Sequence, residues 1–188
     1  MLFRSQKGLF YFQFKAFNEI PGLRHGIFAR LGGHSGGTLQ SLNLARSVGD
    51  TPAAVDANRQ ALAGIFAPGT LFFTQQTHGT QVHVLDGSPC LAGQNVDGPA
   101  PPEADAMVCE RAGTFPAIQV ADCQAVLIVD PRRRVVANIH SGWRGSIANI
   151  IGATITTLKS RCRSRAADLL VGIGPSLGPC CAEFRNYR

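Results

Sequence analysis

Residues 125–140 read AVLIVDPRRRVVANIH, and this stretch decides the fold that the sequence predicts. Ala125–Asp130 and Val135–His140 are short, apolar and rich in β-branched residues, which is typical of strands. The four residues between them, Pro131–Arg134, are too few for a helical crossover. Because parallel neighbours need a connection of a dozen or more residues, the two strands are expected to pair antiparallel.

Outward from this hairpin, the chain predicts more strands than helices. Asp50-Thr51-Pro52 is a helix start, with a capping side chain followed by proline in the first turn. Regular alternation of strand and helix is missing, which disfavours a doubly wound sheet. The sequence therefore predicts an α+β fold with a mixed, largely antiparallel sheet. One helix is expected from this start up to the stop at Pro68-Gly69, and another over Ser146–Ser160. Further strands are expected at Leu9–Phe14, Arg24–Arg30, Leu71–Thr74, Gln81–Leu85, Ala106–Cys109, Ala117–Ala121 and Leu169–Ile173.

Length and composition bound the class of protein. The chain has 188 residues, 45% hydrophobic and 16% charged, so one domain with a sizeable core is expected and a disordered chain is excluded. Its longest apolar runs fall far short of the ~20 residues of a membrane-spanning helix. The excess of 18 basic over 12 acidic residues is modest, and aromatic residues do not interleave with basic ones as in RNA-binding modules. We therefore expect neither a nucleic-acid nor a membrane partner, and interpret the arginines at 132–134 and 161–165 as a solvated turn and a helix end.

The N-terminal residues Met1–Phe17 are apolar, but Gln13 and Lys15 interrupt them and no small-residue cleavage site follows. We interpret the segment as an edge strand and expect a cytoplasmic, reducing compartment. There, cysteines are thiols or metal ligands rather than a disulfide framework. The six cysteines are Cys90, Cys109, Cys123, Cys162, Cys180 and Cys181.

Three predicted strand ends hold the residues best suited to chemistry. His78 lies in Gln75–Gly79 between two strands, Cys123 follows a strand, and His140 opens the stretch His140–Gly145 before a helix. Functional residues tend to lie where loops leave a rigid scaffold. Two imidazoles and one thiolate suit zinc and leave a fourth position for water or substrate, as in catalytic sites.

The same residues support two other interpretations. Cys123 and His140 could form a nucleophile–base pair without a metal. A copper site with two histidines and one cysteine usually adds an axial methionine, and the chain holds only Met1 and Met107. Copper is therefore disfavoured against zinc.

A series of short motifs follows in the order found in one known family: His25-Gly26, Gly32-Gly33, Ser41–Leu44, Gly49-Asp50, Asn58-Arg59, Gln76–Gly79, Ala104–Ala106, Ala121–Cys123, His140–Gly145 and Gly174–Ser176. In them the chain resembles the bacterial laccase-domain proteins, also named polyphenol oxidases. Members are described as purine nucleoside phosphorylases with adenosine deaminase and methylthioadenosine phosphorylase activity.

The resemblance implies that His78, Cys123 and His140 are zinc ligands of a catalytic site. It also implies a layered α/β/β/α sandwich, and purine nucleosides (adenosine, inosine, methylthioadenosine) and phosphate as substrates. Asp122 is a candidate acceptor that orients a ligand histidine, and Trp143 is a candidate stacking partner for the base. The candidate substrate contacts are Asn43, Arg59, Arg144 and the amides of the glycine-rich loop 31–37.

The chain departs from the family in two places. Members run on for several tens of residues beyond Gly174–Ser176, so residues 1–188 are expected to form a single domain that lacks its C-terminal part, with an exposed apolar patch beside Leu169–Ile173. Gln124 stands where a proline often follows the aspartate-cysteine pair. Two other functions stay open: a metal-free cysteine hydrolase or amidase, and a partner-binding module with a structural zinc site. The oligomeric state is not predicted.

Overall fold

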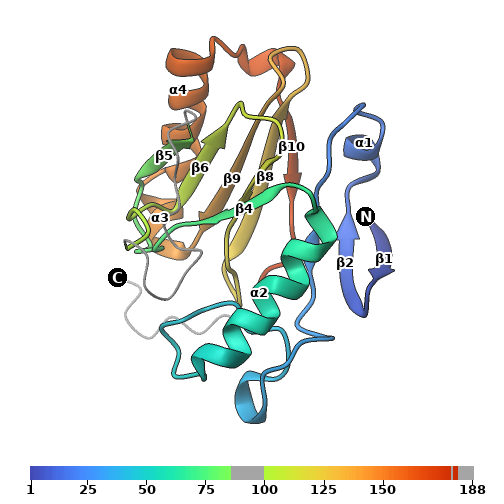
Figure 1. Cartoon of the computed structure of the whole chain (residues 1–188). Helices are drawn as coiled ribbons and strands as arrows, with labels where there is room; N and C mark the ends of the chain where they lie inside the picture. The colour runs from blue at the N-terminus through green and yellow to red at the C-terminus, as the bar shows by residue number, and fades with distance from the viewer. Residues whose placement is uncertain (86–99, 179, 182–188) are drawn as a thin grey trace.

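A computed structural model describes residues 1–85, 100–178 and 180–181; Cys90 lies outside them. Its main element is a five-stranded sheet in the order β10-β8-β9-β6-β5 (Figure 1). The strands are β5 (Val82–Leu85), β6 (Ala106–Cys109), β8 (Gln124–Asp130), β9 (Val135–Ser141) and β10 (Leu170–Ile173). Only β5 and β6 pair parallel, and β8 and β9 pair antiparallel as predicted. The predicted mixed sheet is therefore confirmed.

Two smaller sheets accompany it. β1 (Leu2–Gln6), β2 (Leu9–Gln13) and β3 (Ile27–Phe28) form one, and β4 (Thr70–Phe73) pairs parallel with β7 (Thr114–Ala117) in the other. The N-terminal segment was expected to be one edge strand, and this prediction is wrong. It is a hairpin, because residues 7 and 8 take positive φ angles of 50° and 79° and reverse the chain.

The strand predicted at Ala117–Ala121 is also misplaced, since β7 ends at Ala117. Beyond it, the backbone of Gln119 pairs with a side chain instead of a strand. Its N–H donates to Oε1 of Gln76 at 2.7 Å, and its carbonyl accepts from Nε2 of Gln76 at 2.8 Å. The chain leaves the sheet at the point where this amide takes the place of a neighbouring strand.

The helices are α1 (Lys15–Asn18), α2 (Pro52–Phe66), α3 (Trp143–Ile147) and α4 (Ile150–Cys162). α2 begins as predicted, with the Thr51 side chain accepting from the N–H of Ala54. The helix predicted over Ser146–Ser160 is broken in two. Asn149 has a φ of 64° and its side chain accepts from the N–H of Gly152, so it ends one helix and caps the next. None of the described helices is long and apolar enough to span a membrane.

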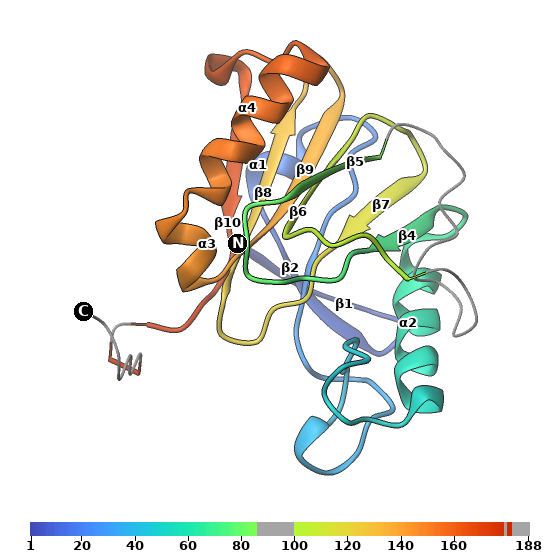
Figure 2. The same cartoon turned by 90° about the vertical axis from the view of Figure 1, so that its left-hand side faces the viewer.

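Each face of the five-stranded sheet packs on a different layer (Figure 2). Val126, Ile128 and Ile139 on one face form a core with Ile150 and Leu158 of α4. The other face rests partly on the N-terminal segment and partly on β4.

β4 separates that other face from α2 because its side chains alternate. Phe72 packs with Met107 of the sheet, whereas Leu71 and Phe73 pack with Leu62 of α2. The packing order is therefore α4, the five-stranded sheet, the β4–β7 pair and α2.

Candidate metal centre

The three predicted ligands lie together at one end of the five-stranded sheet. Cys123 immediately precedes β8, His140 lies on β9, and His78 lies in the loop between β4 and β5. One ligand atom of each lies within 4.8 Å of the other two, and Nε2 of His78 is 4.0 Å from Sγ of Cys123. Zinc bonds of about 2.0–2.3 Å hold neighbouring ligand atoms roughly 3.3–3.8 Å apart. A contraction of about an ångström therefore brings the set to coordination distance.

Asp105 connects the two histidines through hydrogen bonds to its carboxylate. Its fully buried carboxylate accepts from Nδ1 of His140 at 2.8 Å and from the N–H of His78 at 2.9 Å. The N–H groups of Thr77 and Gly79 donate to its other oxygen at 3.1 and 2.8 Å. Burial works to raise the pKa of this carboxyl, but these hydrogen bonds hold it below its ordinary value.

An ionised Asp105 fixes the chemistry of both histidines. Because Nδ1 of His140 donates to the carboxylate, Nε2 is left with the lone pair that binds a metal. His78 has a φ of 61°, a conformation that costs energy for a residue with a side chain, and its N–H bond to Asp105 supports it.

The prediction that Asp122 orients a ligand histidine is wrong. Asp122 is exposed, and its backbone carbonyl accepts from the N–H of Leu177, whereas Nδ1 of His140 bonds to Asp105. Asp105 takes the role. It lies in the motif Ala104–Ala106, but a lone aspartate before a strand gave no sign of partners 26 to 35 residues away.

Gly142 has no side chain, and the ligand cluster occupies the space that a side chain there would fill. A Cβ added there would lie 2.8 Å from Cδ2 of His78, 3.2 Å from Sγ of Cys123 and 3.6 Å from Cε1 of His140. Any larger residue would therefore push a side chain into the three ligands.

The setting of Cys123 fits a metal ligand better than a metal-free nucleophile. Burial raises the pKa of its thiol, and the charges of Asp122 and Asp105 raise it further. Reactive thiolates need nearby positive charge, which a metal cation at this cluster would provide.

The donor set also bears on the choice between zinc and copper. Met107 is fully buried in the core with Phe72 and Leu85, so it offers no axial ligand of the kind that blue copper sites use. Within the part of the chain that the structure describes, His78, Cys123 and His140 form the only cluster of three or more potential ligands. A centre with several coppers would need more. The residues present fit a single zinc ion.

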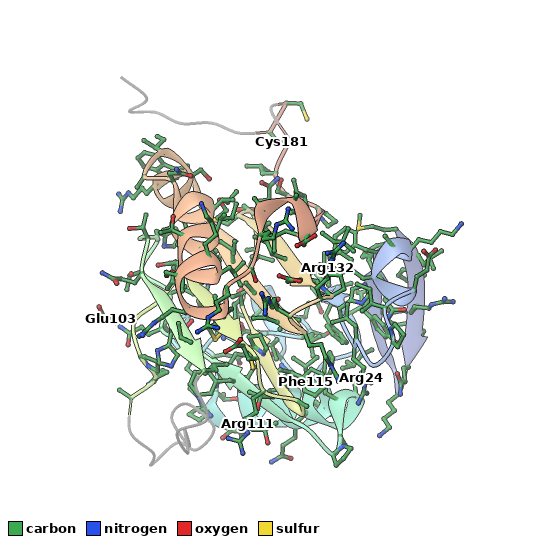
Figure 3. The ribbon with its side chains drawn as sticks, turned by 90° about the horizontal axis from the view of Figure 1, so that it is seen from above. Arg24, Glu103, Arg111, Phe115, Arg132 and Cys181 are labelled. Carbon is green, nitrogen blue, oxygen red and sulfur yellow. The ribbon has the colours of Figure 1, made fainter. Side chains whose placement is uncertain are left out.

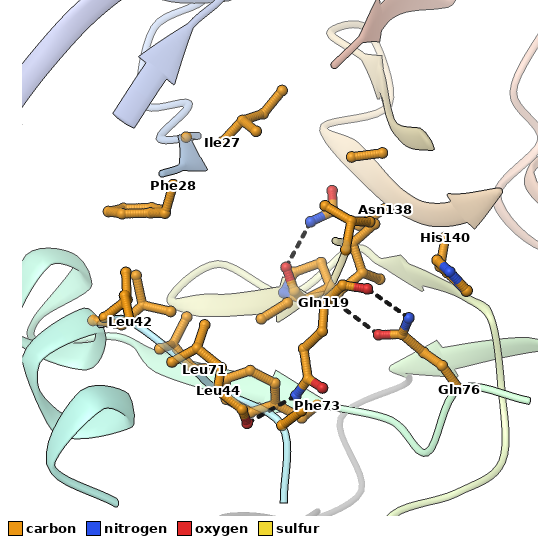
Figure 4. Close-up of a pocket in the computed structure, with 18 of the residues that line it drawn as sticks. Ile27, Phe28, Leu42, Leu44, Leu71, Phe73, Gln76, Gln119, Asn138 and His140 are labelled. Atoms are coloured by element: carbon orange, nitrogen blue, oxygen red, sulfur yellow. Dashed lines mark hydrogen bonds between the residues drawn. The ribbon is translucent and has the colours of Figure 1, made fainter. Parts of the chain in front are cut away.

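The cluster opens into a cavity of about 1620 Å³ (Figure 4). Figure 4 shows Phe28 and Leu42 at one end, His140 at the other, and Gln119 between them. An apolar pocket with a few convergent polar groups is the usual form of a small-molecule site.

The candidate substrate contacts divide between the cavity and its outside. Arg59 and Asn43 line the cavity and Arg144 does not. Arg59 donates to the carbonyl of Leu44 and lies 4.2 Å over the ring of Phe73, and burial lowers its pKa to about 10. It therefore stays protonated at neutral pH. The Asn43 amide donates at 2.8 Å to Oδ2 of Asp50, so it shapes its own loop.

In the glycine-rich loop 31–37, the amides of Gly33 and His34 bond within the protein. The N–H of Gly33 donates to Ser41 Oγ, and that of His34 donates to Oδ1 of Asn58. A Cβ on Gly33 would lie 2.1 Å from the carbonyl oxygen of Ser41. Gly33 therefore serves close packing of the chain on itself, and the amides of Gly33 and His34 are already occupied within the protein.

Trp143 is half exposed at the start of α3, with the Arg144 guanidinium 5.2 Å from its ring. It does not line the cavity. The base-stacking role therefore has no support in the cavity lining.

Comparison with known proteins places these features in a family. The family model described as multi-copper polyphenol oxidoreductase laccase matches residues 24–187. The purine nucleoside phosphorylase YlmD of Geobacillus stearothermophilus is 32% identical over 164 residues, which cover 86% of this chain and 60% of the relative. The purine nucleoside phosphorylase YfiH of Escherichia coli is 34% identical over 158 residues, 82% of this chain and 58% of the relative.

The fold agrees with the sequence match. The crystal structure of YlmD from Geobacillus stearothermophilus superposes with a TM-score of 0.85 at 30% identity, covering 96% of this chain and 67% of that chain. The chain thus spans about three fifths of the length of these curated relatives.

Proposed function

Because this chain belongs to the multi-copper polyphenol oxidoreductase laccase family, we propose that it is a zinc-dependent purine nucleoside phosphorylase. The proposed substrates are adenosine, inosine and methylthioadenosine with phosphate, and the proposed side reaction is deamination of adenosine. One observation carries the proposal: the cluster of His78, Cys123 and His140 opens on a cavity large enough for a nucleoside. The names of the relatives supply the reaction class.

The chain's own residues have separable tasks. His78, Cys123 and His140 hold the ion, and bound zinc supplies a Lewis acid that polarises an oxygen of substrate or water. Asp105 keeps the proton of His140 on Nδ1, away from the ion. The protonated Arg59 places positive charge in the cavity wall, which favours an anionic co-substrate such as phosphate.

We also propose that the protein works in the cytoplasm. The described cysteines, Cys123 among them, are free thiols. A thiolate ligand has to stay reduced, and a reducing compartment keeps it so.

A product assay with zinc analysis tests the proposal. Inosine is expected to yield free base and ribose 1-phosphate only with phosphate present, and adenosine to yield inosine without it. A chelator should stop both reactions. Cys123→Ala should lose zinc and turnover, whereas Cys180→Ala, a change at an exposed thiol, should keep both.

Two outcomes would contradict the proposal. Turnover that ignores phosphate and chelator, but is lost in Cys123→Ala, would identify a metal-free hydrolase. Full zinc content without turnover on any purine nucleoside would contradict the proposed activity of this chain.

A further inference from the structure

The side chain of Gln76 joins the two chain segments that carry His78 and Cys123. Gln76 lies two residues before His78, and its amide bonds to the backbone of Gln119, which lies four residues before Cys123. Figure 4 shows both hydrogen bonds as dashed lines. Because the amide oxygen accepts one bond and the amide nitrogen donates the other, the side chain is held in a single orientation.

The loop of His78 is held at both of its ends without this amide. At its start, Gln75 forms a parallel β-bridge with Glu103, which is labelled at the left of Figure 3. At its other end, the N–H groups of residues 77–79 all donate to the carboxylate of Asp105. The position of this loop is therefore fixed by the chain that leads into β6.

The segment of Cys123 is held differently on its two sides. On the C-terminal side, β8 begins at the very next residue. On the N-terminal side, residues 120–122 are exposed, and the carbonyl of Asp122 accepts from the N–H of Leu177 at 3.0 Å. The paired bonds of Gln119 are the contact that ties this side of the segment directly to the loop of the other ligand.

We propose that Gln76 is a positioning residue of the metal centre, which holds the thiol of Cys123 beside the two histidines. Asp105 bonds to His140 and to the loop of His78, so it fixes the histidines relative to each other. Zinc bonds of about 2.0–2.3 Å tolerate little displacement, so loosening the segment takes the thiol away from the ion. The inference rests on the zinc site of the proposed function and not on its reaction.

Zinc affinity and the chemical reactivity of Cys123 together test the inference. Gln76→Met keeps the length of the side chain and removes both bonds to Gln119. Zinc affinity, measured by chelator competition, should fall about tenfold, as for other groups that orient metal ligands. At saturating zinc, alkylation of Cys123 by iodoacetamide should become about tenfold faster, because a thiolate released from the ion is free to react. Mass spectrometry of the peptide that holds Cys123 measures this rate.

The same substitution at two other glutamines gives the controls. Gln119→Met loses the bond from its side-chain amide to the carbonyl of Leu44 at 3.1 Å, but it keeps the backbone groups that Gln76 bonds. Gln13→Met, in the N-terminal sheet, loses a bond of 3.1 Å from Nε2 to the carbonyl of His25. Both variants should keep the zinc affinity and the slow alkylation of the unchanged chain, even where they lower its melting temperature.

Hydrogen exchange covers the case in which Gln76→Met does not fold. Coupling between two sites is reciprocal, so zinc bound to the unchanged chain should strengthen the bonds between Gln76 and Gln119. Exchange of the Gln119 N–H, followed by NMR, should therefore slow about tenfold when zinc is added. No slowing would overturn the inference.

Three results with the variants would also overturn it. Unchanged affinity and alkylation in Gln76→Met would show that the thiol keeps its place without the amide. A fall in affinity without faster alkylation would place the effect on the histidines. An equal fall in all three variants would indicate a general loss of stability. If the unchanged chain binds no zinc, the metal centre is refuted together with this inference, whereas zinc binding without turnover would contradict the proposed reaction alone.

Discussion

Asp105 and Asp130 occupy similar positions at opposite ends of the sheet and serve different purposes. Both are almost completely buried, and both accept backbone N–H groups. Asp130 accepts from Arg132 at 2.9 Å and Arg133 at 3.0 Å, which shapes the turn between β8 and β9. Asp105 accepts from the loop that holds His78 and also from the ring of His140.

The difference lies in where the backbone donors come from along the chain. The backbone N–H groups that donate to Asp130 belong to a turn of four residues, whereas the donors to Asp105 lie 26 to 35 residues away. A buried carboxylate that accepts backbone N–H groups is therefore not by itself a sign of function. The sign is that its partners include a side chain able to bind a metal.

Replacing each aspartate by asparagine tests this difference most strongly. Asp105→Asn should weaken zinc binding about 10- to 100-fold, because the amide cannot accept every donor and the tautomer of His140 is released. Asp130→Asn should leave zinc binding unchanged and lower the free energy of unfolding by about 1–3 kcal/mol. Chelator competition and urea unfolding measure the two effects. Equal zinc affinity in both variants would remove the distinction.

A glycine beside the metal ligands and a glycine in an open loop give a second comparison. In Gly142→Ala the new methyl group would lie 2.8 Å from the His78 ring. This overpacking should weaken the free energy of zinc binding by about 1–3 kcal/mol. Gly36→Ala is the control, since nothing lies within 4 Å of its added Cβ and its φ is −108°. Chelator competition with both variants measures the difference in zinc affinity. Unchanged zinc affinity in Gly142→Ala would show that the cluster has more room than described.

The pH dependence of stability should reveal the contribution of the ionised Asp130 carboxylate. Burial works to raise the pKa of its carboxyl, but hydrogen bonds that include the N–H groups of Arg132 and Arg133 hold it below its ordinary value. A lowered pKa in the folded state stabilises the protein at neutral pH, and this contribution is lost as pH falls below about 4. The difference in melting temperature between the unchanged chain and Asp130→Asn should therefore shrink from pH 7 to pH 3. A constant difference would refute this assignment.

The smallest expected effect is at the vicinal thiols. Sγ of Cys180 lies 3.3 Å from Sγ of Cys181, both residues are exposed, and neither belongs to the ligand cluster. Replacing either by alanine should leave zinc per protein unchanged. Loss of zinc in either variant would mean that the metal centre extends to this segment.

Much of this protein could be predicted from its sequence, because the decisive patterns are local. Two apolar runs around a four-residue turn allow only an antiparallel pair, and Thr51-Pro52 marks the start of α2. The motifs identified the family, as the family match confirms. They also singled out His78, Cys123 and His140, which the structure brings together.

The tertiary structure decided what depends on distant partners. The position of Asn149 in the left-handed region breaks a helix that apolar periodicity alone extends, and Gln76 ends β7 by bonding the backbone of Gln119. Asp105 became recognisable only when the loop of His78 and the strand of His140 met at its carboxylate. Periodicity and capping act over a few residues and can be read along the chain, whereas a buried charge takes its role from whichever groups the fold places against it.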